Sequence, residues 1–410
     1  MANIFPRKNK DGEITSYTIR VYKGRDSEGN LLKPYTTTFK PEPKWSESKV
    51  QKELQKAAIL FEKQCKEGFV ADNRQSFEQY ANYVIELKEK NGLLKHKTIQ
   101  RYKELMLRIT PAIGYIKIQD LKPQHLNTFY SQLSQDGMNL KTGGKLSAKT
   151  ILEYHRLIHM ILEQAEKEMI VLYNAASKAT PPKYIRKTVN YYELDEVRRI
   201  RRYLKFEPLM WQVALLLLIN CGGRRGEIGG LKDSDFDFEN NTVHIQRNLL
   251  YTKERGVYVD TLKTKSADRI NSLPQYLMDK VQELILQKRK TAKELGDAWY
   301  DTGFLLTQNN GLPIHPDSIT SHCSDFSKKY NKIIEEKNKT RKVQIKPLPH
   351  LNPHAFRHSH VSLLLSNGVD PLAASKRVGH ASPTISYNFY GHLLKAADKR
   401  ASEIFENIIK

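Results

Sequence analysis

Four short segments in the second half of the 410-residue chain bring basic, imidazole and hydroxyl side chains together. They are residues 221–227 (CGGRRGE), 262–269 (LKTKSADR), 354–358 (HAFRH) and 379–392 (GHASPTISYNFYGH). In the first segment, a glycine-rich turn brings Arg224 to the start of a predicted helix. In the third, His354 and Arg357 are three residues apart, so they share one face of a helix. Side chains of these types suit the binding of a phosphate group.

The reaction that such a set could perform is the cleavage of a phosphodiester bond. Two arginines can clamp the non-bridging oxygens and stabilise a pentacoordinate transition state. A lysine on a mobile β-hairpin, here within residues 262–266, can protonate the leaving 5′ oxygen, and histidines can hold the phosphate or accept a proton from a tyrosine. A tyrosine can be the nucleophile, because its phenolate forms a covalent ester. Metal-dependent nucleases need clustered carboxylates instead, whereas these clusters are cationic, so the sequence predicts no metal and no cofactor.

Each segment taken alone has a plain structural explanation. Two arginines after two glycines are typical of a helix end on a surface, and an H-x-x-R pair occurs by chance in many chains. A tyrosine near a C-terminus carries no information by itself. The order and spacing of all four segments within one predicted domain therefore carry the argument.

The net charge points to a polyanionic ligand. The formal charge is +22, and it is spread along the chain as +5 in residues 1–70, +6 in 71–183 and +11 in 184–410. This distribution suits a DNA duplex contacted by several domains, although a lysine-rich solvated surface would give the same numbers.

Composition and patterning disfavour membrane, secreted, disulfide-framed and cysteine-zinc proteins. The longest apolar run, residues 213–219, is far shorter than the ~20 residues that span a bilayer, and no basic-then-apolar stretch marks a secretory signal. Three widely spaced cysteines argue against a disulfide framework and against a cysteine zinc site. A reduced, cytoplasmic protein without a membrane partner is expected.

The sequence patterns around the four segments predict a multidomain fold, whose elements would position them. A small β-sheet-plus-helix domain is expected in residues 1–70, an all-α domain in 71–176, a basic linker with two adjacent prolines in 177–190, and a mixed α+β, mainly α, domain in 191–410. A basic linker of this kind suits two domains that close around a polyanion.

The first of these domains is expected to be a three-stranded sheet with one helix. Residues 16–22 and 33–40 are rich in β-branched and aromatic side chains and predict strands. Ser46 or Ser48 can cap the helix that follows, with Gln51 completing a capping box with Ser48. A basic sheet can lie in a DNA groove or serve only as a folding module.

The second domain reads as four helices. Ser76 and Ser147 are the caps of the first and the last, and Pro111 is expected to end the second, residues 97–110. His155 and His159 are four residues apart on the last helix, which is a metal-binding spacing, but without a third ligand nearby structural histidines are expected.

In the last domain, helices and short strands are expected to mix. The apolar run predicts a buried helix over 209–219, and 236–246 and 257–273 predict an antiparallel sheet. The remaining predicted helices cover 285–295, 318–337, 354–367 and 371–378.

Together and in this order, the segments resemble the tyrosine recombinase (phage-type integrase) family, and in particular the integrases of temperate phages and conjugative transposons. GGRRGEI over 222–228 resembles the family's G-x-R-x-[GS]-E-[LI] box, and KTKS over 263–266 resembles its K-T-x-S hairpin. PHAFRHS over 353–359 resembles P-H-x-[LF]-R-H-[TS]. VGHAS over 378–382 resembles L-G-H-x-S, and FYGH over 389–392 resembles the [IT]-Y-x-H ending.

The resemblance implies a role for each matched residue. The implied catalytic set is Arg224, Lys263, His354, Arg357, His380 and the nucleophile Tyr390, with Glu227 as the acidic partner of Arg224. Tyr387 is a rival nucleophile, and Tyr390 is preferred because a Gly-His pair follows it, as in the family.

Three positions depart from the family pattern. Cys221 stands where the family often has Thr or Ser, Gly223 replaces a larger apolar residue, and Asp233 stands where Trp is common. A glycine at position 223 is expected to loosen the turn before the arginine.

The resemblance also implies the function and the partners. The chain is expected to be a site-specific DNA recombinase that works through a 3′-phosphotyrosine link and integrates and excises a mobile element. Its expected partners are double-stranded DNA at attachment or transposon-end sites and three further copies of itself in a tetramer on two duplexes. An excisionase or a host DNA-bending protein are further candidates. A catalytically silent DNA-binding regulator and a relaxing enzyme of the type IB topoisomerase kind are the alternatives.

The domains receive DNA-binding roles from the same resemblance. Residues 1–70 resemble an arm-type DNA-binding domain, and 71–176 resemble the helical core-binding (SAM-like) domain. The candidate DNA contacts are Arg20, Tyr22, Lys97, Arg101 and Lys149. Residues 401–409 predict an amphipathic helix whose apolar stripe either docks in a neighbouring protomer or covers the chain's own core.

Overall fold

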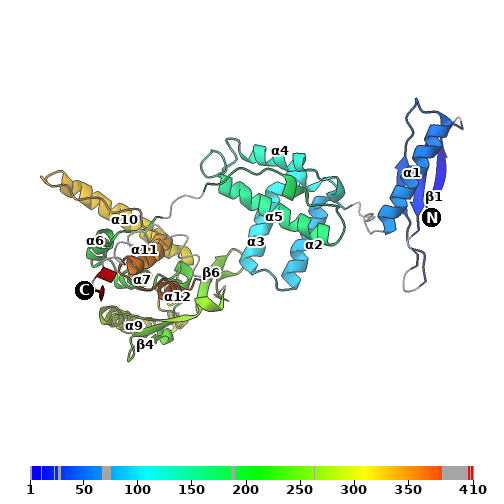
Figure 1. Ribbon diagram of the computed structural model, residues 1–410. Coiled ribbons are helices and arrows are strands. Elements are labelled where there is room, and N and C mark those ends of the chain that lie inside the picture. Colours follow the sequence, from blue (N-terminus) through cyan, green and yellow to red (C-terminus); the bar gives the residue numbers. More distant parts are fainter. Residues whose placement is uncertain are drawn as a thin grey trace. The chain divides into compact units, whose positions relative to one another are not determined.

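A computed structural model describes residues 2–10, 12–22, 24–25, 29–66, 75–185, 190–262, 264–380, 405–406 and 408–409 (Figure 1). The chain separates into two compact units, Met1–Arg186 and Lys187–Lys410. The first unit contains two hydrophobic cores, one within the N-terminal sheet and helix and one within the helices that follow. The second unit has one main core.

The N-terminal part is an antiparallel sheet with one helix. The strands are β1 (Asn3–Lys8), β2 (Ile14–Val21) and β3 (Tyr35–Phe39) in that order, and α1 (Glu47–Lys66) contributes Leu54, Ala58 and Phe61 to the core. The chain enters α1 at Ser46, whose carbonyl accepts the Val50 N–H at 2.9 Å. Ser48 therefore lies inside the helix, and the expected capping box of Ser48 with Gln51 is wrong.

The helical part that follows is built from α2 (Phe77–Lys90), α3 (His96–Ile109), α4 (Pro123–Leu133) and α5 (Ala148–Lys167), with short turns η1 (Thr110–Gly114), η2 (Ile118–Asp120) and η3 (Ala175–Lys178). Ser76 forms a capping box with Gln79 at the start of α2, and Ser147 caps α5, as predicted. The α-helix α3 ends at Ile109 with Thr110 as its C-cap, directly before Pro111, as predicted, and the chain continues through Pro111 as one wide π-turn, η1. A proline is tolerated there since the first residues of a helical turn need no intrahelical N–H partner.

The two histidines of α5 bind protein groups. His155 Nδ1 is 3.0 Å from the Tyr130 hydroxyl, and His159 Nε2 is 3.1 Å from the Ser177 hydroxyl. Both imidazoles are thus engaged within the domain, which agrees with the expectation of structural histidines.

The C-terminal unit is mainly helical. Its helices are α6 (Leu194–Leu204), α7 (Leu209–Cys221), α8 (Arg225–Gly229), α9 (Gln275–Leu295), α10 (Pro316–Asn338), α11 (Pro353–Ser366) and α12 (Pro371–Val378). The apolar α7 is buried on nearly all sides and forms the centre of the core. Helices α8, α9, α10 and α11 pack against α7, and Figure 1 shows α9, α10 and α11 around it.

Two small sheets complete this unit. One has the order β4 (Phe236–Asp237), β5 (Thr242–Ile245), β8 (Arg269–Ser272), and the other pairs β6 (Arg247–Thr252) with β7 (Gly256–Thr261). Residues 262–268 therefore connect two different sheets, and the expected hairpin around this segment is wrong. Strand β8 pairs with β5, and its alternate residues Arg269 and Asn271 point inward, where they donate to polar groups of other elements.

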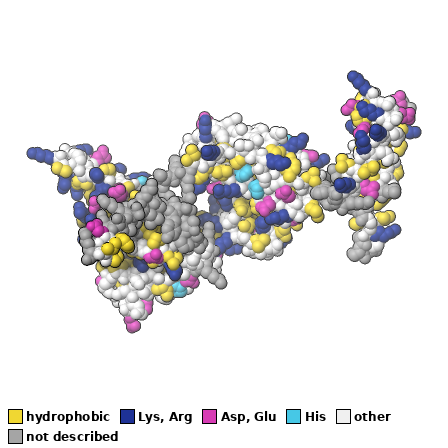
Figure 2. All heavy atoms as spheres, in the orientation of Figure 1, with side chains coloured by type: hydrophobic (Ala, Val, Ile, Leu, Met, Phe, Trp, Pro, Cys, Tyr) yellow, Lys and Arg dark blue, Asp and Glu magenta, His cyan; other side chains and the backbone are white. Residues whose placement is uncertain are grey.

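The surface agrees with the charge analysis. Figure 2 shows Lys and Arg side chains on the N-terminal part, on the helical part and on the C-terminal unit. Within the ranges that the structure covers, none of the helices is both long and apolar enough to cross a membrane.

Candidate active site

The first site segment begins where α7 ends. Gly222 is the C-cap of α7 and has a left-handed backbone with φ +57°. A Cβ at this position would lie 2.8 Å from Val378 Cγ1, so the turn needs glycine both for its conformation and for its packing. Gly223 is also closely packed, because a Cβ there would lie 2.7 Å from Ile228 Cδ1. Ile228 Cδ1 is the end of a flexible side chain, so this contact does not decide how loose the turn is, and the looser turn expected from Gly223 stays a prediction.

Arg224 is the N-cap of α8 and is held by the carboxylate of Glu227. Its backbone N–H donates to Glu227 Oε2 at 3.0 Å, and its Nη1 donates to Oε1 at 2.6 Å. The Arg224 side chain is still 43% exposed, so part of the guanidinium faces solvent and can meet a ligand.

The neighbouring Arg225 has other partners. Its guanidinium forms an ion pair with Asp317 and donates to the Thr320 hydroxyl at 3.2 Å, both on α10. The two adjacent arginines thus have different environments, and Arg224 is the one whose partner lies within the first site segment.

Glu227 is almost fully buried, with 2% of its side chain exposed. Burial raises the pKa of this carboxyl, but the charges of Arg269 and Arg224 outweigh it and leave the pKa below its ordinary value. The carboxylate is therefore ionised at neutral pH and can orient both guanidinium groups.

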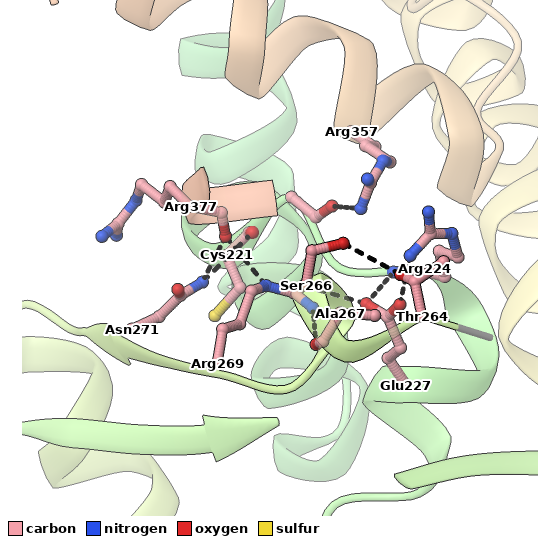
Figure 3. A network of polar contacts seen from close by, with 11 residues as sticks. Cys221, Arg224, Glu227, Thr264, Ser266, Ala267, Arg269, Asn271, Arg357 and Arg377 are labelled. Carbon is pink, nitrogen blue, oxygen red and sulfur yellow. Dashed lines mark hydrogen bonds and ion pairs between the residues drawn. The ribbon is translucent and has the colours of Figure 1, made fainter. Parts of the chain in front are cut away.

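The third site segment lies at the start of α11. Asn352 caps this helix by accepting the Ala355 N–H at 2.8 Å, and Pro353 occupies its first turn. Arg357 is buried, and its Nη1 donates to the Gly222 carbonyl at 3.0 Å. His354 is exposed, and its ring meets that of His358 edge-on at 4.8 Å. Arg357 therefore reaches the turn that precedes Arg224, although the two segments are far apart in the sequence (Figure 3).

His380 follows the left-handed Gly379 that ends α12. Partial burial, together with the positive charges of Arg357 and Arg224, lowers the pKa of His380 to about 3. The imidazole is neutral at physiological pH, so it can accept or donate a hydrogen bond at a phosphate. The same charges show that His380 belongs to the electrostatic environment of both arginines.

Two residues of the expected catalytic set, Lys263 and Tyr390, lie outside the described residues, as does the rival Tyr387. Thr264, directly after the lysine, is described, and its hydroxyl is 2.9 Å from that of Ser266.

The expected DNA contacts differ in their surroundings. Tyr22, Lys97 and Lys149 are exposed, and Arg20 lies over the Phe5 ring at 4.8 Å. Arg101 forms ion pairs at 3.1 Å and 2.7 Å with two glutamates of its own domain. Those pairs make Arg101 a weaker candidate for a phosphate contact than the two lysines.

One residue near the site has no counterpart among the sequence predictions. Arg377 on α12 donates to the carbonyls of Asn220 and Ser272 at 3.1 Å and 3.0 Å, and to His360 Nε2 at 3.2 Å. It ties α12 to the end of α7 and to β8. The sequence around Arg377 has no feature that predicts these backbone partners.

The described geometry can bind and polarise a phosphate. Figure 3 shows one half-exposed guanidinium, held by a carboxylate, and one buried guanidinium on the same side of the turn. Both arginines also lower the pKa of His380, whose imidazole is neutral. Such fixed cationic donors stabilise the charge that develops on phosphate oxygens in a transition state.

A model described as the phage integrase family matches residues 190–397, just over half of the chain. The chain belongs to this family. A second model, the N-terminal SAM-like domain of phage integrases, matches residues 76–134, within the helical part. The fold therefore combines a helical SAM-like domain with an integrase catalytic domain that is mainly helical with small sheets. The integrase is a tyrosine-type recombinase, an enzyme of DNA strand exchange.

The chain is similar in sequence to a transposon transposase and to a tyrosine recombinase. The transposase from transposon Tn916 of Enterococcus faecalis is 25% identical over 324 residues, which cover 78% of this chain and 70% of the relative. A XerC-like tyrosine recombinase of Caldanaerobacter subterraneus subsp. tengcongensis is 24% identical, with 72% of this chain and 73% of the relative covered.

Solved structures show the same fold. A fragment of the Tn1549 transposon integrase in complex with transposon right end DNA matches with a TM-score of 0.63 at 22% identity, covering 80% of this chain and all of the fragment. A lambda integrase dimer bound to a core site matches with a TM-score of 0.51 at 13% identity, covering 94% of each chain.

Proposed function

We propose that this integrase integrates and excises its own mobile element, using Arg224, Lys263, His354, Arg357, His380 and Tyr390 as the catalytic set and Glu227 as the support of Arg224. The observation that carries the proposal is the hydrogen bond from Arg357 to the Gly222 carbonyl, which brings two distant arginine segments to one turn. The neutral His380, whose pKa both arginines lower, is the third member of the proposed phosphate-binding group.

The first chemical step is a transesterification. The Tyr390 phenolic oxygen attacks the scissile phosphorus, a 3′-phosphotyrosine bond forms, and the bond to the 5′ oxygen breaks. Lys263 supplies the proton to that leaving oxygen, and a histidine accepts the proton of the tyrosine. Arg224 and Arg357 hold the non-bridging oxygens through the transition state.

The second step reverses the first on a new partner. The free 5′ hydroxyl of the other duplex attacks the phosphotyrosine, which restores a phosphodiester and releases Tyr390. The ester keeps the energy of the original bond, so rejoining needs no nucleotide hydrolysis.

The DNA substrate is inferred from the relatives. Because the Tn1549 integrase is solved with transposon right end DNA and with circular intermediate DNA, we expect this chain to bind the ends of the element that encodes it. In the proposed layout, residues 1–70 bind arm sites, 71–176 bind the core site, 177–190 link the domains and 191–410 carry out catalysis.

The proposed assembly is a tetramer on two duplexes, and lambda integrase is solved as a tetramer on a Holliday junction. Near the C-terminus of this chain, Phe405, Ile408 and Ile409 are 64%, 74% and 69% exposed. Exposed apolar side chains of this kind support docking in a neighbouring protomer rather than against the chain's own core. An excisionase or a host DNA-bending protein would act on this assembly.

A covalent-trapping assay tests the proposal. The full chain is incubated with nicked duplexes from the ends of its element and resolved on a denaturing gel. We expect a protein–DNA adduct that is lost in Tyr390→Phe and kept in the matched control Tyr387→Phe.

Other outcomes would change the conclusion. Salt-sensitive binding without an adduct, even on a scissile phosphate whose 5′ oxygen is sulfur, would favour a silent DNA-binding regulator. An adduct with supercoil relaxation but without joining of two sites would favour the topoisomerase-like alternative. An adduct kept in Tyr390→Phe and lost in Tyr387→Phe would show that Tyr387, and not Tyr390, is the nucleophile.

A further inference from the structure

Arg269, on β8, makes contacts that none of the roles above explains. Its side chain is 6% exposed, and its guanidinium donates to three different segments (Figure 3). Nε donates to the Arg377 carbonyl at 2.9 Å, Nη1 to the Ala267 carbonyl at 2.8 Å, and Nη2 to Glu227 Oε2 at 2.9 Å.

Each of these three acceptors lies close in sequence to a proposed catalytic side chain. Ala267 ends the short 3-10 turn Lys265–Ala267, which follows Lys263. Glu227 holds Arg224 through both of its oxygens. Arg377 lies near the end of α12, and the chain passes from there through Gly379 to His380.

Two of the three segments also touch each other directly, at Gly379. A Cβ on this residue would lie 2.9 Å from the Ser266 carbonyl oxygen, 3.0 Å from Ala267 Cα and 3.1 Å from Arg269 Nη1. Glycine also suits the left-handed backbone there, with φ +68°. The end of α12 and the turn after Lys263 are thus in van der Waals contact, and Arg269 lies beside that contact.

Asn271 reinforces the same junction from the next inward position of β8. Its amide donates to the Arg377 carbonyl at 3.1 Å, the same oxygen that Arg269 Nε meets, and to the Cys221 carbonyl at 3.4 Å. Strand β8 therefore ties the end of α12 to the end of α7.

We infer that Arg269 is a positioning residue of the active site, whose one buried guanidinium sets the Lys263 segment, the Glu227–Arg224 pair and the His380 segment relative to one another; the inference rests on the proposed function. Only arginine can fill this role, because its planar fork presents donors in several fixed directions. A lysine offers one nitrogen and cannot reach three separated acceptors in this geometry.

The test compares two scissile linkages under single-turnover conditions, with the full chain and nicked element-end duplexes. One duplex has the ordinary 5′ oxygen and the other has sulfur at that position. Sulfur leaves without protonation, so its cleavage does not need the proton from Lys263. The ratio of the two rates therefore reports the placement of the lysine segment, which a general loss of folded protein would not change.

Arg269→Lys and Arg269→Ala are expected to cleave the oxygen substrate about 100-fold more slowly than the unchanged protein, the loss that a displacement of about 1 Å causes at a reacting centre. The deficit should shrink to about 10-fold on the sulfur substrate, leaving the part that reflects Arg224 and His380. Gly379→Ala keeps Arg269 but forces the two segments apart, and it should show the same larger deficit on oxygen.

The matched control is Lys288→Ala, which removes a largely buried ion pair with Asp233 elsewhere in the same unit, 2.7 Å between the charged atoms. It should lose stability while keeping the oxygen-to-sulfur rate ratio of the unchanged protein. If Arg269→Ala fails to fold, Arg269→Lys and Gly379→Ala decide the question.

Three outcomes are decisive. Oxygen-substrate cleavage by Arg269→Lys within twofold of the unchanged protein would overturn the inference and leave the proposed function standing. Equal deficits on oxygen and sulfur would overturn the link between Arg269 and the lysine segment. No adduct from the unchanged protein on either duplex would refute the proposed function, and the inference with it.

Discussion

Replacing Glu227 by glutamine should destabilise the C-terminal unit strongly, although the two side chains have nearly the same shape. The Glu227 and Arg269 side chains are 2% and 6% exposed, so the substitution leaves a buried guanidinium without its counter-charge. Breaking a buried pair from one side costs about 3–5 kcal/mol. The contact with the half-exposed Arg224 adds little because solvent screens it. The glutamine oxygen still accepts one hydrogen bond, so we expect a loss near the lower end, about 3 kcal/mol.

The assay is denaturant unfolding followed by tryptophan fluorescence in a Trp45→Phe background. Of the three tryptophans, the other two, Trp211 and Trp299, lie in the C-terminal unit and report only its unfolding. Asp195→Asn is the control, because its pair with Arg198 is exposed on both sides and should contribute nothing measurable.

The pH dependence gives a second check on the same variant. The pKa of Glu227 is lowered in the folded protein relative to its ordinary value of 4.5, so its stabilising contribution is present above that value. The contribution is lost as the pH falls through the folded pKa, where the protonated glutamic acid resembles glutamine. The stability gap between the unchanged protein and Glu227→Gln should therefore stay constant above pH 4.5 and close below it. A gap under about 1 kcal/mol at pH 7, or one that persists at low pH, would refute this account of the network.

Three further predictions use other parts of the site. Arg224→Ala should lower covalent-adduct formation about 10²–10³-fold, whereas Arg225→Ala should cleave normally, since its partners are on α10; the reverse pattern would show that the catalytic arginine has been misassigned. Burial and the charge of a neighbouring arginine lower the pKa of His360 to about 4, so the unfolded chain binds the extra proton between that value and 6.5. Acidifying from pH 7.5 to 5.5 should therefore cost the unchanged protein about 1.4 kcal/mol more stability than it costs His360→Gln, and equal slopes in the two proteins would contradict this. Gly222→Ala should lose more stability than Gly256→Ala in the same unfolding assay. Both have positive φ, but only the first has no room for a Cβ. Equal losses would mean that packing at this turn costs nothing.

Local sequence features predicted local structure well. The Ser76 cap of α2 and the apolar run of α7 lie where the sequence indicates, because caps and apolar stripes depend on neighbours three or four residues away. The Ser48 capping box failed because a second serine two residues earlier competes for the same role, and the helix begins after Ser46.

Sheet pairing was less predictable. The sequence suggests one hairpin around residues 262–268, but the two flanking strands pair in different sheets. The alternation of a short strand does not say which distant strand it joins. Here the inward polar residues Arg269 and Asn271 find partners on α7, α8 and α12, and this tertiary environment determines the position of β8.

The sequence alone determined the kind of protein: the order of the motifs, the identity of the candidate residues and the family, since these depend only on residue type and spacing. Tertiary structure decided how these residues work together. It placed Arg357 on the Gly222 carbonyl, paired Arg225 with Asp317 and joined three segments through Arg269. These contacts end largely on backbone carbonyls, which every residue has, so no sequence pattern marks them. Only the packing that brings a buried guanidinium within 3 Å of them reveals which carbonyls are used.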